Sequence, residues 1–226
     1  MNIKKTRRQV LTGAAVLSSQ WFIPQSLANN SPATTPKKKR PMMKTSIDLD
    51  RFVADCLIAN KESEAQMAIQ EVLKESLSNP KDMLSALGPP TQAGIQVLHA
   101  SEALTIFNAS WTPQMNLLPH SHLMWALIGI YTGREDNIMW RQTEREIKAY
   151  GAEALFEGDV AALADDVVHS VTNPLQRFTG GLHIYGGDFF HTTRSQWDPE
   201  TLTEEPSDGP AIKAMFEKEN KRLNLG

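Results

Sequence analysis

The chain has 226 residues, of which 41% are hydrophobic and 7% aromatic, enough for one ordinary core but hardly for two domains. Its 23 basic and 26 acidic residues give a net charge of −3, which excludes the strongly basic surface that a nucleic-acid partner requires. Cys56 is the only cysteine, so an internal disulfide and a cluster of thiolate metal ligands are both excluded.

Residues 1–28 have the layout of an export signal. Basic residues precede an uncharged run from Val10 to Ile23, and Ser26-Leu27-Ala28 offers the small residues that a signal peptidase requires. The stretch from Thr6 to Leu11 resembles a twin-arginine signal, which implies transport of a folded protein by the twin-arginine export machinery. The apolar run is shorter than the ~20 residues that span a bilayer.

We therefore predict cleavage after Ala28, a periplasmic or otherwise exported mature protein, and no stable membrane span in it. A disordered basic tail or a single membrane anchor is the alternative, and an unused signal would leave the protein in the cytoplasm. Residues 29–44 are rich in Pro, Thr, Ser and Lys, a composition that predicts a flexible linker. The basic run at 37–40 is interpreted as solvated linker charge, with contact to anionic lipid as the alternative.

Residues 45–90 are predicted to be helical. Apolar residues recur at helical spacing from Ile47 to Leu77, and Ser46 with Asp48 favours a helix start. Pro80 and the turn at residues 88–90 are expected to close this segment. Cys56 falls inside it and is predicted to be a buried apolar residue, because no histidine or other base lies near it in the sequence.

Residues 91–195 change to short β-type runs separated by Gly, Pro, Asn and Asp, a pattern typical of a small barrel or sandwich. The runs are Ile95–Leu98, Leu104–Trp111, Leu117–Tyr131, Asn137–Arg141, Ala152–Phe156, Asp166–Val171 and Gly181–Tyr185. Residues 196–226 are predicted to be a tail followed by an exposed amphipathic helix from Ala211 to Leu223. The predicted fold class is thus mainly β, with one domain from residue 45 to residue 226.

Three histidines on these runs are candidate metal ligands. Residues two apart on a strand point to the same face, so His120 and His122 can bind one ion together. His169 lies in a later run of β-branched residues and is the natural third ligand. Taken alone, a His-x-His pair is equally compatible with two ordinary hydrogen-bonded histidines.

The wider pattern around these histidines resembles a known superfamily. His120-Ser121-His122 followed by Gly133, and Gly158-Asp159 followed by His169 and Asn173, resemble the two metal motifs of the cupins over roughly residues 91–190. The resemblance implies a double-stranded β-helix, or jelly-roll barrel. Most cupins add a glutamate ligand shortly after the first pair, and residues 123–128 contain none. A three-histidine site without that glutamate is typical of the thiol dioxygenases.

A third motif supports the same branch. The segment from Gly181 to Tyr185 is similar to the Ser-x-His-x-Tyr motif of cysteine dioxygenase, with Gly181 in place of the serine. His183 and Tyr185 share a strand face, so His183 can orient the phenol. The resemblance to cysteine and 3-mercaptopropionate dioxygenases implies a catalytic role for both residues. It also implies an iron(II) cofactor, and O2 and a small thiol as substrates that yield a sulfinate.

The chain departs from the family at two further points. The cysteine that cross-links to the motif tyrosine in animal-type enzymes is expected near Leu127, so no Cys-Tyr cross-link is expected here. In cysteine dioxygenase an arginine upstream of the metal pair binds the carboxylate of cysteine, but no arginine lies between Arg51 and Arg134 here. Cysteine is therefore not the expected substrate. Gln96 is the nearest match to the glutamine that relatives acting on 3-mercaptopropionate use. Arg134 is an alternative substrate-binding residue, as are Arg141 and Arg177.

Two other function classes stay open at this stage. One is a metal-dependent cupin of different chemistry, such as an isomerase or a carbon-bond dioxygenase. The other is a non-enzymatic periplasmic cupin that binds a ligand without turnover.

Overall fold

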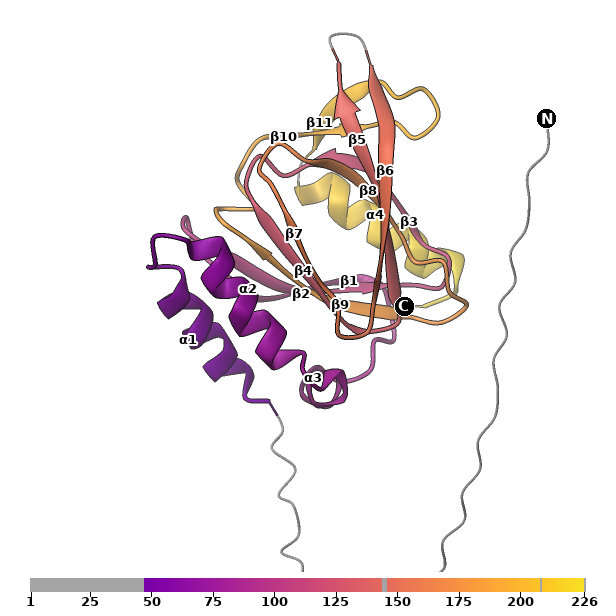
Figure 1. The fold of residues 1–226 in the computed structure, drawn as a ribbon. Coiled ribbons are helices and arrows are strands. Elements are labelled where there is room, and N and C mark those ends of the chain that lie inside the picture. Colours follow the sequence, from indigo (N-terminus) through magenta and orange to yellow (C-terminus); the bar gives the residue numbers. More distant parts are fainter. Residues whose placement is uncertain (1–46, 144–145, 208, 226) are drawn as a thin grey trace, which may run out of the picture. The chain divides into compact units, whose positions relative to one another are not determined.

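Two antiparallel sheets make up most of the structure, a computed structural model that describes residues 47–143, 146–207 and 209–225 (Figure 1). The predicted signal peptide and linker lie outside these residues. The strands are β1 Gly94–Ala100, β2 Thr105–Trp111, β3 Asn116–Ser121, β4 Ala126–Thr132, β5 Arg134–Gln142, β6 Ile147–Phe156, β7 Val160–Leu163, β8 Val168–Thr172, β9 Thr179–Tyr185, β10 Arg194–Trp197 and β11 Glu204–Ser207.

The order of the strands identifies the topology. The first sheet runs β1-β2-β9-β4-β7 and the second runs β11-β10-β3-β8-β5-β6. The antiparallel pairs β5–β6, β4–β7, β3–β8 and β2–β9 are nested inside one another, as in a single long hairpin that has been rolled up. This nesting is a jelly roll, the double-stranded β-helix of the cupins, and it confirms the predicted fold class.

The strand limits differ from the sequence prediction in two places. The predicted run from Leu117 to Tyr131 forms two strands, β3 and β4, which belong to different sheets and are joined by residues 122–125. The second difference is that β10 and β11 lie partly or wholly in the predicted tail. Both are four residues long and largely polar, so they carry too little alternation to be recognised as strands.

Three helices cover the outer face of the first sheet: α1 Leu49–Ala59, α2 Ala65–Ser76 and α3 Pro80–Leu87. Asp48 caps α1 by accepting hydrogen bonds from the backbone N–H groups of Asp50 and Arg51. Pro80, predicted to close the helical segment, instead begins α3, because its missing N–H costs nothing in the first turn. A Cβ at Gly129 would lie 2.5 Å from Leu77 Cδ1, so this glycine lets the helical layer approach β4 closely.

Cys56 lies in the core between these helices and the first sheet and is fully buried. Burial, together with the charge of Asp55, raises the pKa of its thiol to about 12. Because the thiolate is the reactive form, we expect the native protein not to react with a disulfide reagent such as 5,5′-dithiobis(2-nitrobenzoate) at pH 8. One thiol per chain should react after addition of guanidinium chloride. Fast reaction of the native protein would contradict the assigned burial.

The second core lies inside the barrel and is closed on one side by α4, Gly209–Arg222. The ring of Phe216 stacks on that of Trp111 with centroids 5.4 Å apart, and Asn220 exchanges two hydrogen bonds with the backbone of Ala93. The predicted C-terminal helix is therefore present, but it is not simply an exposed helix, because Phe216 is only 5% exposed. Among the described residues, no helix has both the length and the apolar character needed to cross a membrane.

Candidate metal centre

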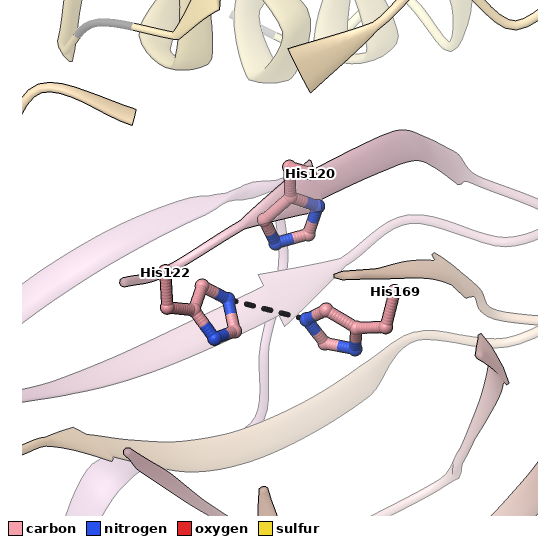
Figure 2. Close-up of side chains that lie close together, drawn as sticks. All are labelled: His120, His122 and His169. Carbon is pink, nitrogen blue, oxygen red and sulfur yellow. Dashed lines mark hydrogen bonds between the residues drawn. The ribbon is translucent and has the colours of Figure 1, made fainter. Parts of the chain in front are cut away.

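The three predicted ligands converge inside the barrel (Figure 2). His120 on β3 lies directly opposite His169 on β8 in the antiparallel register. His122 follows the end of β3, so strand alternation alone does not direct it. The next residue, Leu123, has a φ of 56°, a conformation that is uncommon for a residue with a side chain. One candidate ligand atom from each histidine lies within 4.8 Å of the others.

The spacing between the nitrogens of two of these histidines fits one shared metal ion. Nε2 of His122 and Nε2 of His169 are 3.2 Å apart. Two nitrogens that each lie about 2.1 Å from one ion, at an angle of about 90–110°, are separated by roughly 3.0–3.4 Å. This pair therefore fits one ion, and His120 completes a group whose candidate ligand atoms lie within 4.8 Å of one another. Nδ1 of His122 is buried and has no hydrogen-bond partner among the described residues, so the contact that usually orients a metal-binding histidine is absent at this residue.

The surroundings of the three imidazoles lower their pKa values. Burial lowers the pKa of His120 to about 4, against a smaller raising effect of the hydrogen bond to the Leu118 carbonyl. Burial also lowers the pKa of His122 and His169 well below the usual value, and the neighbouring histidines lower both further. The rings are thus neutral at pH 7, the form that donates a lone pair to a metal.

The tautomer of His169 is fixed by Asn137 on β5. Nδ1 of His169 lies 2.6 Å from Oδ1 of Asn137, and an amide oxygen can only accept a hydrogen bond. Nδ1 therefore carries the proton, and Nε2 is left free for a metal. Such a contact behind a ligand is typical of metal-binding histidines.

The predicted catalytic pair lies beside the histidines on β9 of the opposite sheet. The ring of Tyr185 packs on that of His122 with centroids 4.9 Å apart, and the Tyr185 hydroxyl lies 3.4 Å from Nδ1 of His183. Nε2 of His183 is in turn 3.4 Å from Oε2 of Glu135. Glu135 is fully buried, and nothing in the sequence motifs pointed to it.

A cavity opens in front of this group. It is lined by Ile95, Phe107, Ala109, Trp111, Leu117, Leu118, His120, His169, Val171, His183, Tyr185, Phe189, Gln196, Ser207, Ile212, Met215 and Phe216, the last three from α4. The lining is largely apolar and contains no carboxylate. The space open to the centre of a water molecule is only about 30 Å³, which suits a small ligand.

Arg194 and Gln196 on β10 are polar residues of this region that the sequence prediction missed. Gln196 is paired with His120 in the sheet register, and its Oε1 has no hydrogen-bond partner among the described residues. Arg194 is 3% exposed and does not itself line the cavity, but its guanidinium lies 3.8 Å from the centroid of the ring of Phe189, which does. No carboxylate among the described residues lies at ion-pairing distance from it. Both were missed because β10 falls at the edge of the predicted tail.

The two predicted substrate-binding residues lie elsewhere. Gln96 on β1 is exposed and sits near Asn108, from which it accepts a hydrogen bond of 3.4 Å, in a surface pocket that contains none of the histidines. Its neighbour Ile95 faces the cavity instead, as strand alternation requires. Arg134 makes two hydrogen bonds to Asp136 of the same strand and lies over the Phe156 ring. Neither side chain lines the cavity.

Comparisons with known proteins found similar solved structures but no related sequence. No family model and no curated protein sequence matches the chain. Solved structures that it resembles include an RmlC-like cupin with a double-stranded β-helix from Methanocaldococcus jannaschii, at 12% identity and a TM-score of 0.35 over 44% of this chain and 84% of that one. A cupin superfamily protein from Desulfitobacterium hafniense matches at 16% identity and a TM-score of 0.37, over 46% and 88% of the two chains.

An oxalate decarboxylase variant from Bacillus subtilis matches at 15% identity and a TM-score of 0.36, over 46% of this chain and 28% of that one. At such identities and TM-scores, nothing about the metal or the substrate of these proteins transfers to this chain. The strand nesting and the three converging histidines remain the grounds for a cupin-type fold with a candidate metal site.

Proposed function

We propose that the protein is an iron(II)-dependent dioxygenase that adds both atoms of O2 to the sulfur of a small thiol. The observation that carries the proposal is the joint arrangement of three neutral histidines, with no carboxylate in the cluster, beside Tyr185 and His183. This set of residues matches the pattern that the sequence shares with the thiol dioxygenases. The reaction is balanced without a further reductant, because RSH + O2 gives RSO2H.

The metal would be held by His120, His122 and His169. When bound there, iron(II) would supply open coordination positions and two positive charges, a combination that favours thiolate and O2 as ligands. The apolar cavity wall excludes bulk water from the reacting sulfur. Tyr185 faces the histidines, and burial raises the pKa of its phenol, so the hydroxyl keeps its proton and can donate a hydrogen bond to the substrate or to oxygen.

The charges around the cavity favour a thiol that carries a carboxylate and lacks an ammonium group. Arg194 is a buried cation without a carboxylate partner among the described residues, whereas the cavity lining offers no carboxylate to an ammonium group. A 3-mercaptopropionate-like acid fits this balance better than cysteine does. We propose Arg194, assisted by the Gln196 amide, as the group that binds the substrate carboxylate in place of the predicted Gln96 and Arg134.

The direct test is oxygen uptake by the iron(II)-loaded protein with 3-mercaptopropionate, cysteine, cysteamine and homocysteine. We expect uptake and a matching yield of sulfinate with 3-mercaptopropionate, and less with cysteine. Uptake with none of the four would refute the thiol dioxygenase. Metal analysis of the protein as purified belongs to the same experiment, because three imidazoles also accept zinc, nickel or copper.

A further inference from the structure

Glu135 is a buried carboxylate that the proposed function does not yet use. It projects from β5 into the barrel, is fully buried, and has no lysine or arginine at ion-pairing distance among the described residues. Removing a carboxylate from water is costly unless hydrogen bonds or a counter-charge compensate it. The contacts that compensate the buried charge of Glu135 therefore indicate its role.

The contacts of Glu135 reach two groups: the metal ligand His169, and the pair formed by His183 and Tyr185. Nδ2 of Asn137 donates a hydrogen bond of 3.1 Å to Oε1 of Glu135, and Nε1 of Trp111 donates one of 3.0 Å to Oε2. Because Glu135 accepts from the amide nitrogen of Asn137, the amide oxygen must point the other way, toward Nδ1 of His169. Glu135 thus determines, through Asn137, which nitrogen of His169 is left for the metal.

The second branch leads to the tyrosine. Oε2 of Glu135 is 3.4 Å from Nε2 of His183, and Nδ1 of His183 is 3.4 Å from the Tyr185 hydroxyl. A proton on Nε2 is favoured by the facing carboxylate, which leaves Nδ1 as the atom that meets the phenol. Nε2 of His183 is buried and makes no hydrogen bond to any described residue, so the Glu135 carboxylate acts on it as a facing charge.

Position 181, where the motif has a serine and this chain has a glycine, lies next to the same nitrogen, Nε2 of His183. A Cβ at Gly181 would be 3.4 Å from Nε2 of His183, so a serine there would bring a hydroxyl to the atom that Glu135 faces in this chain. The other close neighbours of such a Cβ are Cδ1 of Ile130 at 3.0 Å and the Gly129 carbonyl at 3.4 Å. The isoleucine methyl is the movable one, which makes serine a feasible substitution.

We propose that Glu135 is a positioning residue with two targets. It orients the metal ligand His169, and it orients His183 and thereby Tyr185. It takes the place of the serine hydroxyl that position 181 lacks. The inference rests on the proposed function for its catalytic meaning, but the contacts of Glu135 can be tested without metal or substrate. One buried carboxylate, outside the metal cluster, then couples the metal ligand on one sheet to the tyrosine on the other.

The test compares Glu135→Gln with the double variant Glu135→Gln/Gly181→Ser. The matched control is Glu153→Gln, which neutralises an exposed carboxylate on β6, opposite Asn137 in the register. The first readout is nitrogen NMR of the metal-free proteins with 15N-labelled histidine, in which the His183 ring is assigned from a His183→Gln variant. We expect Glu135→Gln to shift the His183 ring signals, Gly181→Ser to shift them back toward wild type, and the control to leave them unchanged.

The second readout is turnover of the iron-loaded proteins with the best thiol of the panel. Changes in groups that orient a metal site typically cost about 10–100-fold. We expect a loss of that size in kcat for Glu135→Gln, with little change in KM and with part of the loss recovered by Gly181→Ser. Unshifted His183 signals in Glu135→Gln, or shifted signals and lost turnover that Gly181→Ser does not move back, would overturn the role of Glu135.

If the wild-type protein oxidises no thiol, the proposed function fails, while the NMR comparison still decides the role of Glu135. If Glu135→Gln does not fold, Asn137→Ala gives a second route, because it interrupts only the branch to His169. That variant should bind the metal more weakly, by about 10–100-fold, and keep the wild-type His183 signals. Unchanged metal affinity in Asn137→Ala would overturn the branch to His169.

Discussion

Replacing His169 by alanine should abolish stoichiometric metal binding. The variant removes one of three ligands, and the other two provide no carboxylate or thiolate to compensate within the cluster. Loss of a contact behind a ligand already costs 10–100-fold in metal affinity, so loss of the ligand itself should weaken binding by more than about 100-fold. The measurement is iron per chain by elemental analysis after loading under anaerobic conditions and desalting.

A matched control is His191→Ala. His191 is exposed, is paired with Asp188 and does not belong to the histidine cluster. The control should bind as much iron as the wild type and gain the same rise in melting temperature on loading, because a ligand that binds only the folded state stabilises it. His169→Ala should show no such rise. Full metal content in His169→Ala would disprove the ligand assignment even if the variant were less stable.

The candidate metal ligands could be predicted from the sequence because they are the residues that local patterns describe. His120 and His122 are two apart next to a strand end, and His169 stands in a β-branched run. The jelly-roll class followed from the motifs that surround them. Alternation along β9 placed His183 and Tyr185 on one face, and the structure has both lining the same cavity.

The residues that surround the ligands could not be predicted in the same way. Glu135 and Asn137 reach the site because β5 pairs with β8, a contact between segments about 30 residues apart that no local pattern reports. The place of Gln96 in the chain relative to the histidines predicts a substrate-binding residue, but a difference of one residue on a strand reverses the face, and Ile95 lines the cavity instead. Arg194 and Gln196 lie on a strand too short and polar to be recognised.

Replacing Arg194 by glutamine should remove the selectivity for thiols that carry a carboxylate. Burial lowers the pKa of Arg194, and the guanidinium lies close enough to Tyr185 to lower the pKa of the phenol, against the larger raising effect of burial. A hydrogen-bonded charge pair of this kind contributes roughly 2–3 kcal/mol. We therefore expect kcat/KM for 3-mercaptopropionate to fall by about 30–150-fold, since 1.36 kcal/mol corresponds to a factor of ten.

Cysteamine supplies the internal control because it carries the thiol without a carboxylate. Its kcat/KM should stay the same or rise in Arg194→Gln, since the variant removes a buried cation that repels the ammonium group. The two substrates therefore separate a specific loss of carboxylate binding from general damage to the site, which would lower both rates alike. An equal loss for both thiols would show that Arg194 supports the structure and does not select the substrate. The substrate preference would then have to arise from the shape of the apolar cavity under α4, where Phe216 and Met215 limit the room for a longer chain.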